Sequence, residues 1–141
     1  MSARAEAPHR LSIRVYYEDT DLAGIVYYAN YLKFIERGRS EWLRALGLDQ
    51  AALLSARGLA FAVRRVEADY LAPAGLDDLL EVISRPVALT PARLVLHQQV
   101  ARTGQVLFDA QVTLACVDTR ARPPRPVRLP QEFRQKLAPH A

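Results

Sequence analysis

Residues 11–31 read LSIRVYYEDTDLAGIVYYANY, and within this stretch the chain passes from a strand pattern through a polar loop into a helix. In residues 11–17 every second side chain is apolar or aromatic on one side: Ile13, Val15 and Tyr17. This period of two is typical of a half-buried β-strand. Residues 18–24, EDTDLAG, are mostly polar and end in glycine, which predicts a loop.

A helical pattern follows from Ala29 to Gly47, with apolar side chains on one face: Tyr31, Phe34, Ile35, Trp42 and Leu46. Asn30 or a neighbour can cap its start, and Gly47 can supply the left-handed residue that ends it. Gly38 in mid-helix predicts a close packing contact, because glycine lowers helix propensity. Arg37 and Glu41 are spaced for an ion pair. A short helix is expected over residues 50–57.

The chain after Gly58 is rich in strand patterns separated by turn residues. The expected strands are 59–70, 79–89, 93–101 and 105–117. Pro86 predicts a bulge or an open edge in the second of them. The order of one strand, one long helix and four strands predicts an α+β domain, in which an antiparallel sheet of about five strands wraps around the helix.

The length of 141 residues fits one domain. We expect a flexible leader over residues 1–10, the folded domain over 11–119 and a surface tail rich in proline and arginine over 120–141. An amphipathic turn is expected in the tail around Phe133 and Leu137.

Composition excludes several classes of protein. Cys116 is the one cysteine, so neither an intrachain disulfide nor a cysteine-rich zinc site can form. We expect a cytoplasmic protein, since the chain shows no secretory signal pattern and no apolar stretch long enough for a transmembrane segment. The net charge is +4, but a basic stripe with stacking aromatics is lacking, so nucleic-acid binding is not predicted. An anionic small molecule fits the mild basicity.

The acidic loop, residues 18–24, is the best candidate to supply catalytic residues. The chain contains no Gly-x-Ser-x-Gly motif, and we interpret His97 and Cys116 as structural residues within strands, His97 without a partner to orient it. The carboxylates left are Glu18, Asp19 and Asp21. They can form a solvated loop before the helix. A calcium loop is disfavoured because Ala23 and Asn30 occupy ligand positions, and an aspartate-dependent phosphatase because its parallel sheet is not predicted.

The loop and its surroundings also carry a resemblance. Residues 14–31, RVYYEDTDLAGIVYYANY, continue to Phe34 and to 36–41, ERGRSE, and later come Tyr70, Pro73-Ala74 and Asp77-Asp78. This pattern resembles the 4-hydroxybenzoyl-CoA thioesterase family of hotdog proteins, in particular its branch associated with the bacterial Tol-Pal system. The likeness covers almost the whole domain and implies a hotdog fold.

The resemblance implies hydrolysis of acyl-CoA thioesters to free acid and CoA, with Asp21 as nucleophile or general base. It further implies that a helix N-terminal N–H, that of Tyr28, polarises the thioester carbonyl, which agrees with the physics of oxyanion stabilisation. Relatives of the Tol-Pal branch often carry histidine where Tyr28 stands, so short aliphatic and aromatic acyl groups both remain open. A non-catalytic hotdog module that binds acyl-CoA or a Tol-Pal partner is the alternative.

Binding residues and partners follow from the same interpretation. Substrate contacts are expected at Gly24, Tyr27 and Tyr31. Arg64 and Arg65 are candidates for the CoA phosphates, as are the tail arginines Arg120, Arg122, Arg125 and Arg128. No metal and no cofactor are expected, since CoA is part of the substrate. The expected partners are further copies of the chain, as a dimer or tetramer, and Tol-Pal-linked proteins.

Overall fold

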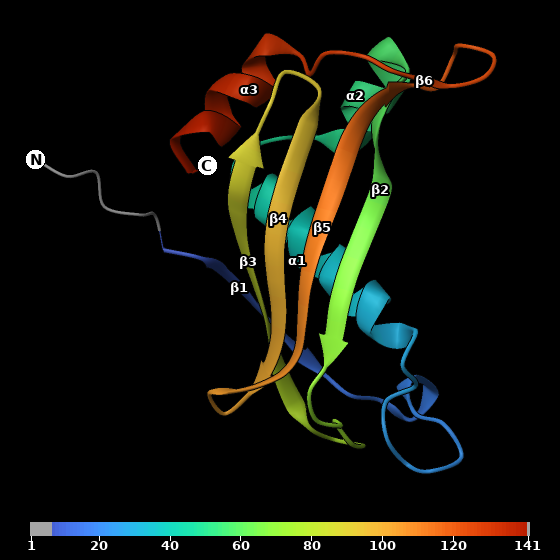
Figure 1. Cartoon of the computed structure of the whole chain (residues 1–141), viewed down its shortest axis with the longest axis vertical. Coiled ribbons are helices and arrows are strands. Elements are labelled where there is room, and N and C mark those ends of the chain that lie inside the picture. Colours follow the sequence, from blue (N-terminus) through green and yellow to red (C-terminus); the bar gives the residue numbers. More distant parts are fainter. Residues whose placement is uncertain (1–6, 141) are drawn as a thin grey trace, which may run out of the picture.

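The computed structural model describes residues 7–140, and in this part of the chain the strands form one curled antiparallel sheet (Figure 1). The strand order is β1-β3-β4-β5-β2, and a short β6 also pairs with β5. The bounds are His9–Arg14 for β1, Leu59–Tyr70 for β2, Leu79–Leu89 for β3, Arg93–Arg102 for β4, Gln105–Asp118 for β5 and Arg125–Pro126 for β6. The edge strands are therefore β1 and β2, and β2 has β5 as its neighbour on one side only.

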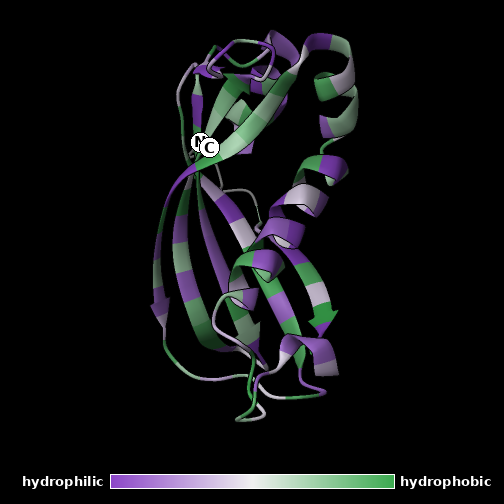
Figure 2. Ribbon diagram, turned by 90° about the vertical axis from the view of Figure 1, so that its right-hand side faces the viewer, coloured by the Kyte–Doolittle hydropathy of each residue, from purple (hydrophilic) through white to green (hydrophobic). Residues whose placement is uncertain are grey.

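Helix α1 (Asn30–Ala45) lies along one face of the sheet (Figure 2). Its apolar side packs on the inward residues of the strands, because side chains alternate between the two faces of a sheet. The core is formed by buried side chains that include Phe34, Ile35, Leu43, Val82, Leu96 and Val112. Inside this core, Gln98 Nε2 donates hydrogen bonds to the Ile35 carbonyl oxygen (2.8 Å) and to Ser84 Oγ (2.9 Å), which ties the helix to β4 and β3.

The two ends of the sheet carry different elements (Figure 1). At one end lie η1 (Tyr17–Asp19) and the loop leading into α1. At the other lie α2 (Gln50–Arg57), α3 (Gln131–Leu137), η2 (Ala138–His140) and the segment before β6. Cys116 is fully buried within β5, and burial raises the pKa of its thiol. No helix within residues 7–140 is both long and apolar enough to cross a bilayer.

The predicted order of elements is confirmed, and so is the α+β arrangement of a sheet around one long helix. The expected ranges of α2, β2 and β3 agree with the structure, and those of β4 and β5 differ by one residue. Gly47 adopts the expected left-handed conformation after α1 (φ 79°). The register between β3 and β4 shifts between Pro86 and Ala88, which confirms the bulge.

Four expectations need correction. Asn30 does not cap α1, because its side chain bonds elsewhere, and Glu41 pairs with Arg44 instead of Arg37. β1 begins at His9, two residues inside the expected leader, and ends at Arg14, three residues before the expected end at Tyr17, which lies in η1. Residues 1–6 of that leader lie outside the described residues. The tail is not all surface, since Leu129, Phe133 and Leu137 are buried against the domain.

Candidate active site

Asp21 lies at the start of a tight turn between η1 and α1. The Asp21 N–H donates to the Ile25 carbonyl (3.0 Å), and the Gly24 N–H donates to the Asp21 carbonyl (3.0 Å). Gly24 has φ 79°, a conformation that side chains disfavour, so glycine is needed for the turn itself. No atom lies within contact distance of a Cβ built on Gly24, which leaves space beside the turn.

The Asp21 carboxylate is exposed. Its Oδ1 accepts the Ala23 N–H (2.9 Å), an Asx-type bond that fixes the side chain in the turn. The Tyr28 hydroxyl, and to a smaller degree the Asp21 charge, raise the pKa of Tyr27. Asp21 is thus a partly free carboxylate beside the aromatic side chains that precede α1.

Asp19, two residues earlier, has a structural role. Its carboxylate is nearly buried, and Oδ2 accepts the Tyr16 N–H (2.8 Å). Its carbonyl oxygen accepts two further bonds, from the Tyr27 N–H (2.9 Å) and from Asn30 Nδ2 (2.9 Å). Asp19 therefore links η1 to the start of α1, and the Asn30 side chain contributes one of the hydrogen bonds that form this link.

The Tyr28 N–H, like the Ala29 N–H next to it, forms no backbone hydrogen bond within residues 7–140. The Asn30 N–H donates to the Tyr27 carbonyl (2.8 Å), and the Tyr28 carbonyl accepts Tyr70 Oη (2.9 Å). Within residues 7–140, by contrast, no acceptor lies in hydrogen-bonding geometry with the Tyr28 N–H. A free N–H immediately before a helix is a ready donor to an oxygen that gains negative charge.

An apolar cavity of about 380 Å³ adjoins Tyr28. It is lined by Ile25, Val26, Tyr28, Tyr31, Tyr70, Leu71, Ala72 and Pro73. Tyr31 is buried, stacks on Phe108 with ring centroids 5.0 Å apart, and accepts the Ala74 N–H at its hydroxyl (3.2 Å). It is therefore both a core residue and part of the cavity wall. Tyr27 does not line this cavity.

The segment from Tyr70 to Pro73 was not predicted as part of the site. The signal was present, since Tyr70 and Pro73-Ala74 belong to the pattern that resembles the thioesterase family. Local sequence could not show that the end of β2 meets the start of α1, because 42 positions separate Tyr70 from Tyr28.

The predicted CoA-binding arginines do not meet Asp21 within one chain. Arg64 and Arg65 lie in mid-β2, about 17–20 Å along the strand from Tyr70. Arg65 forms an ion pair with Glu67 (2.7 Å), and Arg64 lies at a β-bulge. The tail arginines lie at the far end of the sheet, where the Arg120 side chain packs over Gly58.

Charge differs between the two ends of the molecule. Acidic residues gather near the Asp21 loop and the ends of the strands beside it: Glu18, Asp19, Asp21, Asp69, Asp77 and Asp78. Two arginines, Arg14 and Arg102, lie among them. Arg102 forms an ion pair with Asp78 (2.6 Å). Exposed arginines gather at the far end: Arg57, Arg93, Arg120, Arg122, Arg125 and Arg128. The chain is thus negative at the Asp21 end and positive at the other.

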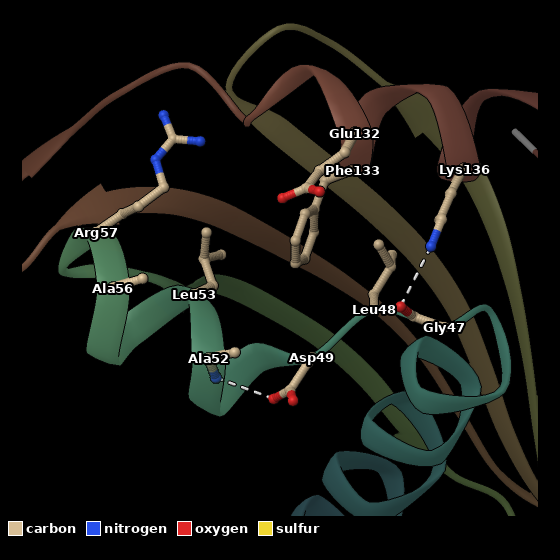
Figure 3. Close-up of a pocket in the computed structure, with 10 residues that line it drawn as sticks. All are labelled: Gly47, Leu48, Asp49, Ala52, Leu53, Ala56, Arg57, Glu132, Phe133 and Lys136. Carbon is tan, nitrogen blue, oxygen red and sulfur yellow. Dashed lines mark hydrogen bonds between the residues drawn. The ribbon is translucent and has the colours of Figure 1, made fainter.

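A second cavity, of about 260 Å³, lies at the positive end between α2 and α3 (Figure 3). Leu53 and Phe133 face each other across it, Lys136 donates to the Gly47 carbonyl (3.3 Å), and Asp49 caps α2 through the Ala52 N–H (2.9 Å). These contacts join the tail helix to the domain. None of the predicted catalytic residues lines this cavity.

His97 has a partner, contrary to the sequence interpretation. His97 Nε2 lies 2.7 Å from Asp109 Oδ1, and Gln99 Nε2 donates to the same oxygen (2.8 Å). Burial alone would raise the pKa of Asp109, but the hydrogen bonds from Gln99 and His97 lower it on balance. The pair lies on the sheet face away from α1, so it does not reach the cavity. Among residues 7–140, no three potential metal ligands of the His, Cys, Asp or Glu type come together.

Comparison with known proteins identifies the family. The model of the Thioesterase-like superfamily matches residues 15–137. The chain belongs to this superfamily. Acyl-CoA thioesterase YbgC of Haemophilus influenzae is 43% identical over 122 residues, which cover 86% of this chain and 88% of that protein. Acyl-CoA thioester hydrolase YbgC of Escherichia coli O6:H1 is 41% identical over 129 residues, 89% of this chain and 96% of that one.

Solved structures of thioesterases share the fold. A probable thioesterase from Bartonella henselae superposes with a TM-score of 0.82 at 38% identity, over 88% of this chain and all of that one (100%). The 4-hydroxybenzoyl-CoA thioesterase of Pseudomonas sp. strain CBS-3 has a TM-score of 0.86 at 20% identity, over 93% and 99% of the two chains, and shows the fold alone. The predicted hotdog fold and the resemblance to the thioesterase family are both confirmed.

Proposed function

We propose that the protein hydrolyses acyl-CoA thioesters, with Asp21 as the catalytic carboxylate and the Tyr28 N–H as the donor to the thioester oxygen. The observation that carries the proposal is that Tyr28, whose N–H has no acceptor within residues 7–140, lines an apolar cavity and lies on the same loop as an exposed carboxylate. The names of the YbgC relatives, at 41–43% identity, support the same reaction.

The chemistry follows from these groups. The cavity receives the acyl chain, and the Tyr28 N–H stabilises the negative charge that develops on the carbonyl oxygen. Asp21 either attacks the carbonyl carbon, which yields a mixed anhydride that water then cleaves, or takes a proton from the attacking water. In both routes the C–S bond breaks, CoA leaves as a thiolate that gains a proton, and one water molecule is consumed.

The test is turnover of a panel of short aliphatic and aromatic acyl-CoA thioesters by the wild-type protein and two variants. Asp21→Asn keeps the size of the side chain but removes the carboxylate, so kcat should fall by at least about a hundredfold. Asp19→Asn is the matched control in the same loop and should be milder, with its cost mainly in stability. An Asp21→Asn protein with wild-type turnover and an unchanged melting temperature would overturn the mechanism.

We further propose that the active unit is a homodimer joined along β2. The outer edge of β2 has no neighbour within residues 7–140, and open edges of long strands favour pairing with another chain. Val63 and Val66 belong to the core face of β2 but are 49% and 37% exposed at this edge. Leu22, next to Asp21, is fully exposed, as expected of a residue that a second copy covers.

A two-fold axis at the β2 edge would also bring the predicted CoA-binding arginines of one copy near the Asp21 site of the other. Two β2 strands related by such an axis run antiparallel, so the start of one β2 faces the end of the other. Arg120 packs over Gly58, directly before β2, and Tyr70 ends β2 beside the cavity. The positive end of one copy then lies beside the negative, Asp21 end of its partner. We propose that the tail arginines bind the CoA phosphates of the partner's site, with Arg64 and Arg65 near the axis.

Other expectations remain predictions from the sequence and the resemblance. The reaction should need no cofactor, because CoA arrives with the substrate. A cytoplasmic location agrees with the single thiol and a CoA substrate, and Tol-Pal-linked proteins stay as predicted partners. The cavity does not separate aliphatic from aromatic acyl groups, which is why the panel contains both.

A further inference from the structure

A small cavity lies between the middle of α1 and the start of β2. It has a volume of about 200 Å³, and its lining includes Glu36, Arg39, Ser40 and Leu43 of α1 and Phe61 and Val63 of β2. Helix α1 packs most closely on β1, β3 and β4, so this side of the helix faces the edge strand that has a neighbour on one side only. The cavity is therefore continuous with the β2 edge, where Val63 is exposed.

The guanidinium of Arg39 is half-buried in this cavity and has few acceptors. Its one hydrogen bond within residues 7–140 runs from Nη1 to Gln98 Oε1, at the long distance of 3.5 Å. No carboxylate of these residues forms an ion pair with it. Burial lowers the pKa of Arg39, which the charge of Glu36 partly offsets, but an arginine keeps its proton at neutral pH. A buried charge without a partner is costly, so an anionic group beside Arg39 would be stabilising.

Glu36 carries such a group on the same side of the helix. Its side chain is exposed, and Oε2 accepts a hydrogen bond from Ser40 Oγ (2.6 Å). Glu36 and Arg39 are three residues apart, so both face the β2 edge, yet neither forms an ion pair within residues 7–140. Each chain thus presents one carboxylate and one guanidinium beside the edge strand.

A two-fold axis at the β2 edge would bring this side of α1 close to its copy. Edge strands that pair antiparallel about a two-fold axis require an axis perpendicular to the sheet, so both α1 helices lie on one face and run antiparallel. In such a contact, what residue i of one copy meets in the other is met in return. Contact of Glu36 with Arg39 joins opposite charges twice, whereas contact of like residues would join like charges.

We propose that Glu36 of each subunit forms an ion pair with Arg39 of its partner, so that two equivalent pairs fix how the α1 helices align across the dimer axis. The inference rests on the β2-edge dimer of the proposed function and adds the residues by which a second copy of the chain is recognised. Because other alignments bring like charges together, the two pairs contribute specificity as well as affinity.

Charge reversal tests the pairs, because only the other subunit can compensate for it. Glu36→Arg and Arg39→Glu each place two like charges in one chain, so each variant alone should dimerise at least about tenfold more weakly than the wild type in sedimentation over a dilution series. In an equimolar mixture, opposite charges meet across the axis at both pairs, while like charges remain within each chain. Dimers should therefore recover in the mixture. Arg37→Glu is the matched control, since Arg37 is exposed outside the cavity, and it should dimerise like the wild type.

Circular dichroism and melting temperature show whether the variants fold. If Arg39→Glu does not, Arg39→Gln replaces it in the mixture, where one attractive pair remains and no like charges meet, and native mass spectrometry should show Glu36→Arg chains in heterodimers. Folded variants that dimerise like the wild type, or a mixture that stays monomeric beside a dimeric wild type, would overturn the pairs and leave the β2-edge dimer standing. A monomeric wild type would remove the dimer and the pairs together, while the Asp21→Asn variant would still decide the proposed hydrolysis.

Discussion

Gly38 of α1 lies so close to Val82 of β3 that a Cβ atom on Gly38 would overlap Val82 Cγ1. Glycine in the middle of a helix costs about 1 kcal/mol relative to alanine. The close contact expected from the sequence is therefore confirmed, and it explains the glycine. Val82 is fully buried, and its branched side chain is short and stiff, so it cannot swing aside.

Gly38→Ala should lower the free energy of unfolding by about 1–3 kcal/mol, because overpacking outweighs the better helix propensity of alanine. Urea denaturation measures the change. In Gly38→Ala combined with Val82→Ala, the two costs should be less than additive, since the second change removes the atom that clashes. A single Gly38→Ala variant that is more stable than the wild type would contradict the contact.

The tail helix should stabilise the domain without taking part in catalysis. Phe133 of α3 is buried, packs against Phe61 (centroids 6.2 Å apart) and lies at the end of the molecule away from Asp21. Phe133→Ala should cost about 3 kcal/mol of stability and leave kcat unchanged below the melting temperature. Glu132→Ala, an exposed neighbour on the same helix, is the control. Equal thermal melts for the two variants would show that α3 is not docked.

If the dimer forms along β2, charged side chains introduced at the β2 edge should prevent dimerisation. Val63→Lys with Val66→Lys should give a monomer by light scattering at micromolar concentration, with most of the turnover lost, because two lysines would be buried without partners. Val87→Lys is the matched control, since Val87 is 50% exposed on β3, away from the β2 edge. A wild-type protein that is monomeric and active at this concentration would contradict the dimer.

Binding of CoA across the subunits predicts recovery of activity on mixing. The Asp21→Asn protein and a variant with Arg120, Arg122 and Arg125 all changed to Gln should each be poor at low acyl-CoA concentration. After unfolding and refolding together, heterodimers contain one site with both elements intact, and about a quarter of the wild-type activity should return. Acyl-pantetheine, which lacks the nucleotide phosphates, should not respond to the arginine changes. Mixtures no more active than their components would place the arginines outside the partner's site.

Activity should survive EDTA, because the proposed donor to the carbonyl is a backbone N–H and not a metal ion. Turnover measured before and after dialysis against the chelator should agree within error. Loss of turnover with recovery on addition of magnesium would instead support the phosphatase interpretation of the acidic loop.

The strands and helices were predictable because their signals are local. The period of two, the turn residues and Gly47 set most element bounds to within one or two residues. What could not be predicted depends on contacts between distant segments. Asn30 bonds to Asp19 only because the loop folds back, and His97 meets Asp109 only through the register of β4 and β5.

The candidate site shows the same division. Asp21 and Tyr28 lie in one continuous motif, so the resemblance could indicate both. Tyr70 and the cavity segment after it come from the far end of β2. The arginine candidates were chosen by charge, and charge alone could not show that they lie away from Asp21 in the same chain.

The buried thiol of Cys116 lets chemical labelling measure how fast and how often the sheet opens around β5. Only the thiolate reacts with common thiol reagents, and burial both shields the sulfur and raises its pKa. Labelling must therefore wait until β5 separates from its neighbours. At high reagent concentration the labelling rate equals the rate of that opening, and at low concentration it reports the equilibrium population of opened molecules. Because the chain has a single cysteine, both quantities can be measured on the natural sequence, without an introduced probe.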